Sequence, residues 1–187
     1  MRIISGISKG KKIFSPKDLQ TRPLKDLTKE SIFNIIVHSN KFNIQLESSL
    51  VLDLFAGTGS FGLECLSRGS DHVTFVENYK EVLTILKKNI LNLDYQNDSL
   101  LIEKDIINNL NFKIFKKKFD IIFLDPPYKE KKLFKILNNI ISSKLLKNSG
   151  IIVIHRHKKE EDEFPKKFKI LDKKIYGISK IIFGTFF

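Results

Sequence analysis

Four short apolar runs of this chain are each followed closely by an acidic residue. The runs lie at 50–52, 72–76, 100–102 and 119–124, and the acids are Asp53, Glu77, Asp105 and Asp125. Runs of this length are typical of buried strands, and segments long enough for a helix separate them. We therefore predict a mostly parallel, doubly wound α/β sheet. The acids are expected at the carboxyl ends of its strands, which is where ligands bind in such sheets.

The remaining segments are expected to extend this core at both ends. A basic hairpin over residues 2–14 and a helix over 25–38 precede it, so we predict an N-terminal extension of residues 1–48 and a core of residues 49–187. Within the core we expect helices at 60–68, 79–93 and 131–146, a further strand at 151–154, a charged loop at 158–167, and a terminal antiparallel hairpin of strands 168–175 and 178–186.

A glycine turn follows the first run, in the sequence Asp53-Leu54-Phe55-Ala56-Gly57-Thr58-Gly59. Gly57 and Gly59 permit a tight turn and close approach of the backbone to a ligand. With Gly62 they also match the dinucleotide fingerprint G-x-G-x-x-G, whose anionic pyrophosphate would lie near the carboxylate of Asp53. S-adenosylmethionine would instead bring cationic groups to this carboxylate. We therefore rank a methyl-donor site first, a purely structural turn second and a dinucleotide site third.

Two further acids are candidates for the same donor site. Glu77, at the end of the second run, is placed to accept hydrogen bonds from ribose hydroxyls. Asp105 is placed to accept a hydrogen bond from an adenine amino group, or to act as the N-cap of a helix in the segment that follows it. The predicted cofactor-binding set is Asp53, Phe55, Ala56, Gly57, Gly59, Glu77, Asn78, Asp105 and Ile106.

The fourth run ends in Asp125-Pro126-Pro127-Tyr128. Two prolines force a stiff turn, which places a carboxylate, the Pro126 carbonyl and an aromatic ring at the end of the strand. Two acceptors beside a stacking ring suit a planar group that carries –NH2. Hydrogen bonds to both acceptors would help to localise the amine lone pair for attack on a methyl group. These four residues are the predicted catalytic site for alkylation of a nucleobase amine; the alternative is a Pro-rich turn with a solvated Asp.

The net charge of +12 indicates an acidic partner. Residues 51–110 carry a net charge of −4, whereas residues 1–50 carry +5 and residues 111–187 carry +11. This distribution fits an acidic donor cleft between basic surfaces for phosphates. Lysines scattered over solvated faces would give the same totals.

The sequence offers little for other chemistries. The single cysteine, Cys65, is expected to pack inside a helix, and His155 and His157 are expected at the surface beside Arg156. No His/Cys cluster has metal-ligand spacing, so no metal is expected. No apolar run reaches membrane-spanning length and the N-terminus has no signal-peptide pattern. A cytoplasmic protein with no membrane partner is therefore expected.

Over nearly its full length the chain resembles the RsmD family, bacterial methyltransferases that modify a guanine N2 in 16S ribosomal RNA. The resemblance rests on the glycine turn, on Glu77 and on Asp-Pro-Pro-Tyr, and on an N-terminal block that separates this family from other amino methyltransferases. The remaining matching segments are Arg2-Ile3-Ile4-Ser5-Gly6, Lys9-Gly10-Lys11-Lys12, Arg22-Pro23, Lys29-Glu30-Ser31-Ile32-Phe33-Asn34, Gly62-Leu63-Glu64 and Leu66-Ser67-Arg68-Gly69.

The resemblance implies a class I methyltransferase fold with a seven-stranded sheet, S-adenosylmethionine as donor, no metal, and a guanine flipped into the Asp-Pro-Pro-Tyr pocket. It implies 16S rRNA in the assembling small ribosomal subunit as partner, with ribosomal proteins as a further contact, for a protein expected to be a monomer. The residues implied to contact RNA are Arg2, Lys9, Lys11, Lys12 and Arg22.

The chain departs from the family pattern at Leu24 and Lys25, at Leu27 and at His155, where relatives often have threonines, an arginine and a glutamate. These departures leave the donor site unchanged and concern the RNA contacts. Two other functions stay open beside the dinucleotide enzyme. One is a DNA adenine-N6 or cytosine-N4 methyltransferase, although the chain has little room for a DNA-recognition domain. The other is a non-catalytic RNA-binding factor in ribosome assembly.

Overall fold

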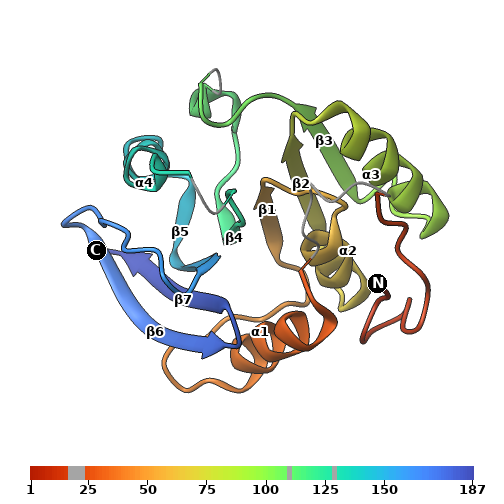
Figure 1. The fold of residues 1–187 in the computed structure, drawn as a ribbon, viewed down its shortest axis with the longest axis horizontal. Helices are drawn as coiled ribbons and strands as arrows, with labels where there is room; N and C mark the ends of the chain where they lie inside the picture. The colour runs from red at the N-terminus through yellow and green to blue at the C-terminus, as the bar shows by residue number, and fades with distance from the viewer. Residues whose placement is uncertain (17–23, 109–110, 128–129) are drawn as a thin grey trace.

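The computed structural model describes residues 1–16, 24–108, 111–127 and 130–187, which form one seven-stranded sheet with helices on both faces (Figure 1). The strand order is β3-β2-β1-β4-β5-β7-β6. The strands are β1 (Leu50–Leu54), β2 (His72–Glu77), β3 (Ser99–Glu103), β4 (Phe119–Leu124), β5 (Leu146–His157), β6 (Phe168–Tyr176) and β7 (Ser179–Phe186).

The pairing of the strands confirms the predicted topology. Strands β1 to β5 pair with one another in parallel, and β7 is antiparallel to both β5 and β6. The chain builds the sheet from β1 outward in one direction to β3, then returns to place β4 on the other side of β1. The reversal lies between β1 and β4, and the crevice at the carboxyl ends of such strands is the usual ligand site of a doubly wound sheet.

Helices cover both faces of the sheet and define two core clusters. The helices are α1 (Asp26–His38), α2 (Ser60–Ser67), α3 (Lys80–Asn92) and α4 (Leu133–Ser142), with a 3-10 turn η1 (Phe112–Ile114). Side chains of α1, α2 and α3 pack in one cluster, and those of α4 pack in the other. In the first cluster Phe61 stacks between Phe33 and Phe123, with ring centroids 5.1 and 4.0 Å away. This stack fixes α1 and α2 against β4.

Two expected boundaries were wrong near α4 and β5. The helix predicted to reach residue 146 ends at Ser142, because Lys144 takes a left-handed φ of 51° and Leu145 N–H bonds back to the Ile140 carbonyl at 3.2 Å. The strand predicted at 151–154 extends to His157, because its last residues pair with β7. β5 therefore carries polar residues into the sheet edge where the candidate site lies.

The expected N-terminal hairpin is reduced to one antiparallel bridge, between Arg2 and Lys12. Gly6 and Gly10 both have a φ of +83°, which turns the chain between the bridged residues and interrupts any longer ladder. Ile3 is fully buried in the first core cluster. The N-terminal loop (residues 1–14) therefore packs onto the core, and the proposed division at residue 48 stays a prediction.

Candidate active site

The turn of residues 55–59 joins β1 to α2, and we call it the donor turn. Phe55, Gly57 and Gly59 have φ values of 62°, 56° and 82°. Left-handed geometry costs roughly 1–2 kcal/mol for a residue with a side chain, and strain of this kind is characteristic of functional sites. A Cβ on Gly59 would lie 2.5 Å from Leu86 Cδ1, whereas one on Gly57 would meet nothing within 4 Å. Packing therefore explains Gly59, while Gly57 leaves open space beside the backbone.

Glu77, at the carboxyl end of β2, holds the donor turn in place. Its Oε2 accepts a hydrogen bond from the N–H of Gly57 at 2.8 Å. Its Oε1 accepts from the N–H groups of Asn78 and Tyr79 at 2.8 and 3.0 Å. One carboxylate thus joins the loop after β1 to the loop after β2. A role toward ribose hydroxyls stays a prediction, and Oε2, which accepts one of these three bonds, retains acceptor capacity.

Asp53 is almost completely buried near the end of β1, with 1% of its surface exposed. Its Oδ2 accepts a hydrogen bond from the Gly62 N–H at 3.0 Å, and Oδ1 has no hydrogen-bond partner among the described residues. Burial raises the pKa of this carboxyl well above its usual range. The Gly62 bond opposes that shift, and the negative charges of Asp125 and Glu77 add to it. Asp53 therefore has two other acids, Asp125 and Glu77, in its surroundings. Its buried Oδ1 still has the capacity to accept hydrogen bonds from a ligand.

This electrostatic arrangement fits a cationic ligand better than an anionic one. A positive charge near Asp53 would relieve the repulsion from Asp125 and Glu77, whereas a pyrophosphate would increase it. A helix N-terminus binds phosphate through free N–H groups, but at α2 the Gly62 N–H already bonds to the Asp53 carboxylate. The charges of the sulfonium and ammonium of S-adenosylmethionine suit this site, and binding of this donor by Asp53, the donor turn and Glu77 stays a prediction.

Asp105 lies two residues beyond β3 and closes a local turn. Its Oδ1 accepts hydrogen bonds from the N–H groups of Ile107 and Asn108 at 2.8 and 3.0 Å, and its Oδ2 accepts from the Asn108 amide at 2.9 Å. Partial burial acts to raise the pKa of Asp105, but these bonds prevail and hold it below its usual range. Asp105 therefore caps a turn of residues 106–108, and not the helix whose N-cap was expected. Contact with an adenine, by Asp105 or by the buried Ile106, stays a prediction.

The Asp125-Pro126-Pro127 segment leaves the carboxyl end of β4 beside the end of β1. The N–H of Asp125 approaches the Leu54 carbonyl at 3.4 Å. The Asp125 side chain is 22% exposed, Pro126 is buried and Pro127 is exposed. Leu54 of β1 pairs with Leu124 of β4, so the predicted amine site adjoins the donor turn. Tyr128 lies outside the described residues, so its stacking role stays a prediction.

Two residues of β5 contact this segment directly. The Nδ1 of His155 lies 2.8 Å from Oδ1 of Asp125. Arg156 donates from Nη1 to the Pro127 carbonyl at 3.1 Å and from Nη2 to the Glu130 carbonyl at 2.9 Å. One β5 residue thus holds the Asp125 side chain and the next holds the backbone after it.

The expectation that His155 and His157 lie at the surface was wrong for His155, which is 5% exposed, while His157 is half-buried. Arg156, between them, is 1% exposed. Arg156 is buried because the loop after β5 folds back over it, and Asp162 from that loop accepts its Nε–H at 2.9 Å. Lys180 of β7 adds a second cation 3.6 Å from the other oxygen of Asp162. An acid six residues beyond an arginine was the only signal in the sequence, and it is a weak one.

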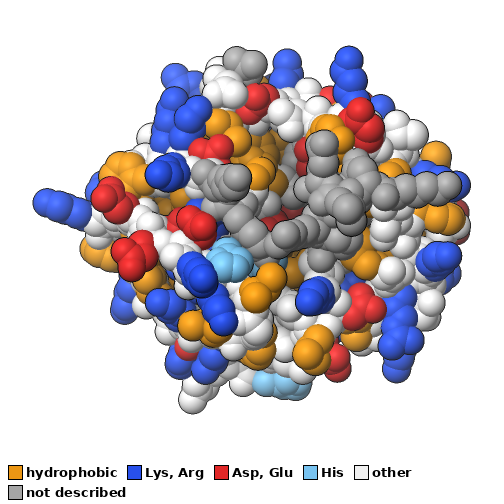
Figure 2. Space-filling model, in the orientation of Figure 1, with side chains coloured by type: hydrophobic (Ala, Val, Ile, Leu, Met, Phe, Trp, Pro, Cys, Tyr) orange, Lys and Arg blue, Asp and Glu red, His pale blue; other side chains and the backbone are white. Residues whose placement is uncertain are grey.

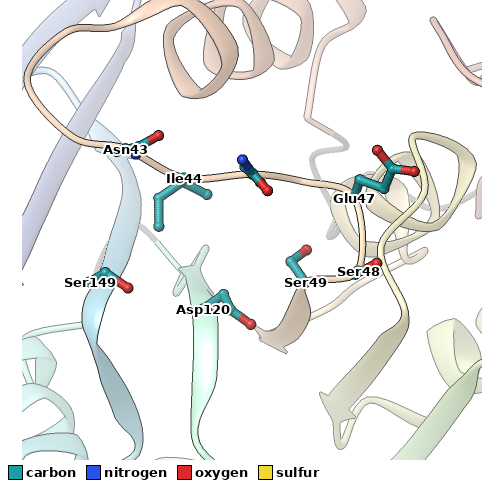
Figure 3. A pocket seen from close by; sticks show the side chains of 8 residues that line it. Asn43, Ile44, Glu47, Ser48, Ser49, Asp120 and Ser149 are labelled. Carbon is teal, nitrogen blue, oxygen red and sulfur yellow. The ribbon is translucent and has the colours of Figure 1, made fainter.

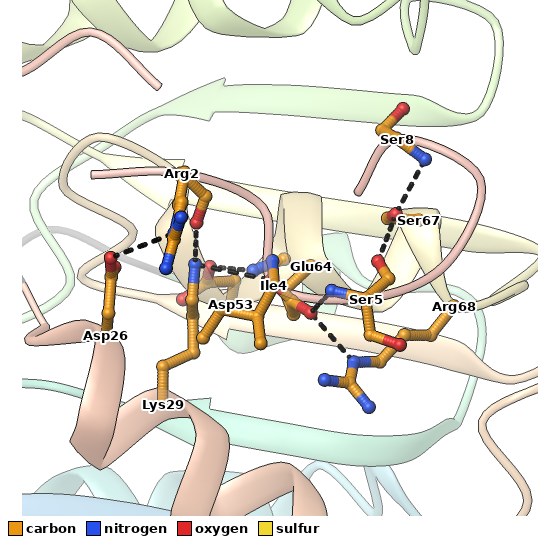
Figure 4. A network of polar contacts seen from close by, with 11 residues as sticks. Arg2, Ile4, Ser5, Ser8, Asp26, Lys29, Asp53, Glu64, Ser67 and Arg68 are labelled. Carbon is orange, nitrogen blue, oxygen red and sulfur yellow. Dashed lines mark hydrogen bonds and ion pairs between the residues drawn. The ribbon is translucent and has the colours of Figure 1, made fainter. Parts of the chain in front are cut away.

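The N-terminal loop is attached to α2 through a buried ionic cluster of Lys29, Glu64 and Arg68 (Figure 4). The fully buried Glu64 accepts hydrogen bonds from the N–H groups of Ile4 and Ser5 at 2.8 and 3.0 Å, and from Arg68 Nε at 2.8 Å. The ammonium of Lys29 lies 3.3 Å from Glu64. Burial lowers the pKa of Lys29, and Glu64 counteracts that shift. Sequence reasoning placed these residues in motifs without finding this role.

A second attachment joins the N-terminal loop to the donor turn. The side chain of Asn89, on α3, accepts a hydrogen bond from the Phe14 N–H at 2.8 Å. Its amide group donates to the carbonyls of Phe14 and Thr58 at 3.1 and 2.9 Å. Thr58 belongs to the donor turn, so one buried amide contacts both segments.

The predicted RNA-contacting side chains of this loop are exposed. Arg2, Lys9, Lys11 and Lys12 all lie at the surface, and Arg22 lies outside the described residues. Figure 2 shows Lys and Arg side chains around much of the outline of the molecule, with Asp and Glu side chains scattered among them. RNA contact itself stays a prediction.

A hollow of about 330 Å³ lies elsewhere, near the amino ends of β1 and β4 (Figure 3). Its main charged group, Asp120, accepts hydrogen bonds from the Leu50 N–H at 2.8 Å and from Lys147 at 2.7 Å. The acid is therefore committed to structure. The hollow is lined by Asn43, Ile44, Gln45, Glu47, Ser48, Ser49, Asp120 and Ser149.

Metal-binding clusters and membrane-spanning helices are both absent from the parts of the chain that the structure describes. In those residues no group of three or more His, Cys, Asp and Glu side chains is arranged to hold a metal ion. Cys65, expected to pack inside a helix, is buried in α2. No helix of the described ranges is long and apolar enough to cross a membrane.

A seven-stranded sheet in this order, with β7 antiparallel and a glycine turn after β1, defines a class I methyltransferase fold. A solved structure of the Escherichia coli protein yhhF superimposes with a TM-score of 0.82 at 25% identity, covering 100% of this chain and 97% of that one. The chain belongs to the Cons_hypoth95 family ("Conserved hypothetical protein 95"), which matches residues 1–185.

Relatives with assigned names agree with this family and confirm the resemblance to RsmD proteins. The Bacillus subtilis protein YlbH is 34% identical over 183 residues, which cover 97% of this chain and 96% of that protein. The "Ribosomal RNA small subunit methyltransferase D" of Buchnera aphidicola (subsp. Acyrthosiphon pisum) is 34% identical over 175 residues, covering 92% of this chain and 86% of that one.

Proposed function

We propose that this protein methylates the exocyclic N2 of a guanine in small-subunit ribosomal RNA, with S-adenosylmethionine as donor. The observation that carries the proposal is the adjacency of two sites at one sheet edge. The buried Asp53, repelled by Asp125 and Glu77, suits a cation, and Asp125 also begins the turn that suits a base amine. The name of the Buchnera relative supports the choice of ribosomal RNA.

The donor supplies an electrophilic methyl group on sulfur, which passes to the amine as the S–CH3 bond breaks and the N–CH3 bond forms. The residues of this chain supply position and charge. Asp125 and the Pro126 carbonyl accept hydrogen bonds from the two N2 protons, which directs the nitrogen lone pair away from them. The methylated nitrogen carries one proton too many, and the Asp125 carboxylate is the nearest acceptor in this pose. Positioning of this kind supplies much of the acceleration in bimolecular transfers.

The RNA would bind through the exposed cations of the N-terminal loop. The N-terminal loop carries the exposed side chains of Arg2, Lys9, Lys11 and Lys12. Hydrogen bonds to Glu64 and Asn89 fix this loop to the core. Phosphate contacts orient a nucleic acid without reading its sequence, so the choice of base falls to the Asp125 pocket. Flipping the guanine out of its stack is required, because in a helix one N2 proton pairs with cytosine and the Asp125 pocket cannot close around a stacked base.

The test is transfer of labelled methyl from S-adenosylmethionine, followed by analysis of the labelled nucleoside. Small subunits from cells lacking the endogenous enzyme are the expected substrate, with naked 16S rRNA and duplex DNA as parallel substrates. N2-methylguanosine recovered from the subunits is the expected result. N6-methyladenine or N4-methylcytosine in DNA would replace the proposal with a DNA enzyme. Donor binding without transfer to any nucleic acid would favour a non-catalytic assembly factor.

A further inference from the structure

We propose that His155 is a positioning residue, which fixes Oδ1 of Asp125 and thereby presents Oδ2 to the target amine. This inference rests on the proposed function, since it assigns Asp125 to the amine. It goes beyond that function in naming a residue of another strand on which the geometry of transfer depends.

The position of His155 follows from strand register. β4 and β5 are parallel, and Leu124 pairs with Ile154, so Asp125 and His155 are the next residues of adjacent strands. β5 continues through His155 because this residue also pairs with Ile181 of β7. β5, which pairs with β4 on one side and β7 on the other, thus places the imidazole beside Asp125. His155 is 5% exposed.

Both nitrogens of the imidazole are engaged. Nδ1 lies 2.8 Å from Asp125 Oδ1, and Nε2 lies 2.9 Å from the hydroxyl of Ser179, itself 7% exposed. A carboxylate only accepts, so Nδ1 carries the proton in this pair. The serine hydroxyl can donate to Nε2 or accept from it, so it suits the neutral and the charged ring alike. Two bonds therefore fix the ring plane and, through it, one oxygen of Asp125.

The backbone that follows Asp125 is fixed independently. Arg156 bonds to the carbonyls of Pro127 and Glu130, and Asp162 holds its guanidinium at 2.8 and 2.9 Å. With the backbone held by Arg156, rotation of the Asp125 side chain is the remaining freedom at this site. The hydrogen bond from His155 prevents this rotation before the substrate binds. The conformational entropy of the Asp125 side chain is therefore lost on folding and not during methyl transfer.

Variants of His155 can separate this role from packing. In His155→Asn the amide nitrogen takes the place of Nδ1 and keeps a donor for Asp125. In His155→Gln the amide group reaches toward Ser179 instead, and His155→Leu removes both bonds while keeping an apolar side chain. Ser179→Ala is the matched control, because it removes only the distant bond of the ring.

The measurements are kcat and KM for methyl transfer, affinity for S-adenosylhomocysteine, and melting temperature. We expect His155→Leu and His155→Gln to lose kcat by roughly 100-fold, the scale of an ångström-sized misplacement. KM, product affinity and melting temperature should change little. His155→Asn should recover most of the rate, and Ser179→Ala should lose less than His155→Leu. Equal rates in the Asn and Leu variants, or losses that follow the melting temperature, would overturn the proposal.

A spectroscopic readout keeps this test independent of activity. In nitrogen-15-labelled protein, the Nδ1–H of His155 should give a protected, low-field proton resonance that disappears in Asp125→Ala. Its absence from the native protein would overturn the pairing whatever the enzyme does. If the native protein methylates no nucleic acid, the proposed function fails, while this resonance still decides whether His155 holds Asp125.

Discussion

Oε2 of Glu77 accepts the amide proton of Gly57 at 2.8 Å, so the end of β2 fixes the strained turn after β1. The two carboxylate oxygens of Glu77 accept hydrogen bonds from the N–H groups of Gly57, Asn78 and Tyr79. Glu77→Gln leaves a single carbonyl oxygen to accept them. Hydrogen bonds to a charged group contribute roughly 1.5–3 kcal/mol each, so affinity for S-adenosylhomocysteine should fall at least tenfold by calorimetry. Glu81→Gln, at an exposed position of α3, is the control and should bind normally. Unchanged affinity of Glu77→Gln for S-adenosylhomocysteine would show that the donor turn keeps its conformation without the Glu77 carboxylate.

Gly6 and Gly10 offer a matched pair of substitutions in the N-terminal loop. Both have a φ of +83°, but a Cβ on Gly6 would lie 1.7 Å from the Ser67 carbonyl oxygen, and one on Gly10 would meet nothing within 4 Å. Gly10→Ala should cost about 1–2 kcal/mol of unfolding free energy through backbone strain alone. Gly6→Ala should cost clearly more, since the loop must leave α2. Chemical denaturation of both variants measures this, and equal costs would contradict the close packing.

Lys9, Lys11 and Lys12 are predicted to contact RNA phosphates. Replacing all three with Ala should weaken binding to small-subunit RNA and make log K less dependent on log salt, by up to about 0.7–0.9 per lost contact. The control replaces Lys116, Lys117 and Lys118 with Ala. This removes the same charge just before the amino end of β4, at the opposite end of the strand from Asp125. An equal change in salt dependence for both triple variants would mean that net charge, and not this loop, governs binding.

Asp53 should make the protein less stable as pH rises. Because burial raises its pKa in the folded state, the folded protein holds this proton at pH values where the unfolded chain, with a pKa near 3.8, has lost it. The stabilising contribution of the neutral acid is complete below the unfolded pKa and is lost as pH rises to the folded pKa. Asp53→Asn should remove this pH-dependent contribution. The unfolding free energies of the native protein and the variant, plotted against pH, should therefore differ by an amount that falls as pH rises. Parallel curves would mean that Asp53 titrates normally.

Asp125→Ala should abolish methyl transfer while leaving donor binding nearly intact. The variant removes an acceptor for the amine, and it also removes one of the negative charges that raise the pKa of Asp53. Affinity for S-adenosylhomocysteine, measured beside turnover, separates the two effects. Parallel loss of both would show that Asp125 mainly maintains the structure of the site.

The sheet and the donor turn were predictable from the sequence because their signals are local. Apolar runs mark buried strands, and Gly57 and Gly59 mark a turn in positive-φ geometry. The burial of His155 and Arg156 was not predictable, because it depends on β7 and on Asp162 of a charged loop that looks solvated in the sequence. Contacts between segments far apart in the chain leave no periodicity to read.

The N-terminal loop shows the same limit in another form. A basic hairpin of two strands was expected over residues 2–14, but Gly6 and Gly10 convert it to a loop with one bridge. What fixes it is the carboxylate of Glu64, 59 and 60 residues further along the chain. A motif match drew attention to these residues without showing that they touch.

The contacts of Arg68 and Arg156 limit how this chain can change. They are two of only four arginines among its 33 basic residues, the rest being lysine. Arg156 serves two carbonyls and a carboxylate at once, and Arg68 bonds to Glu64 while lying 4.5 Å from the Phe33 ring centroid. A lysine has one small ammonium group and cannot reproduce either planar arrangement. Lysine can therefore carry most of the positive charge of the protein's surface, but it cannot replace Arg68 or Arg156.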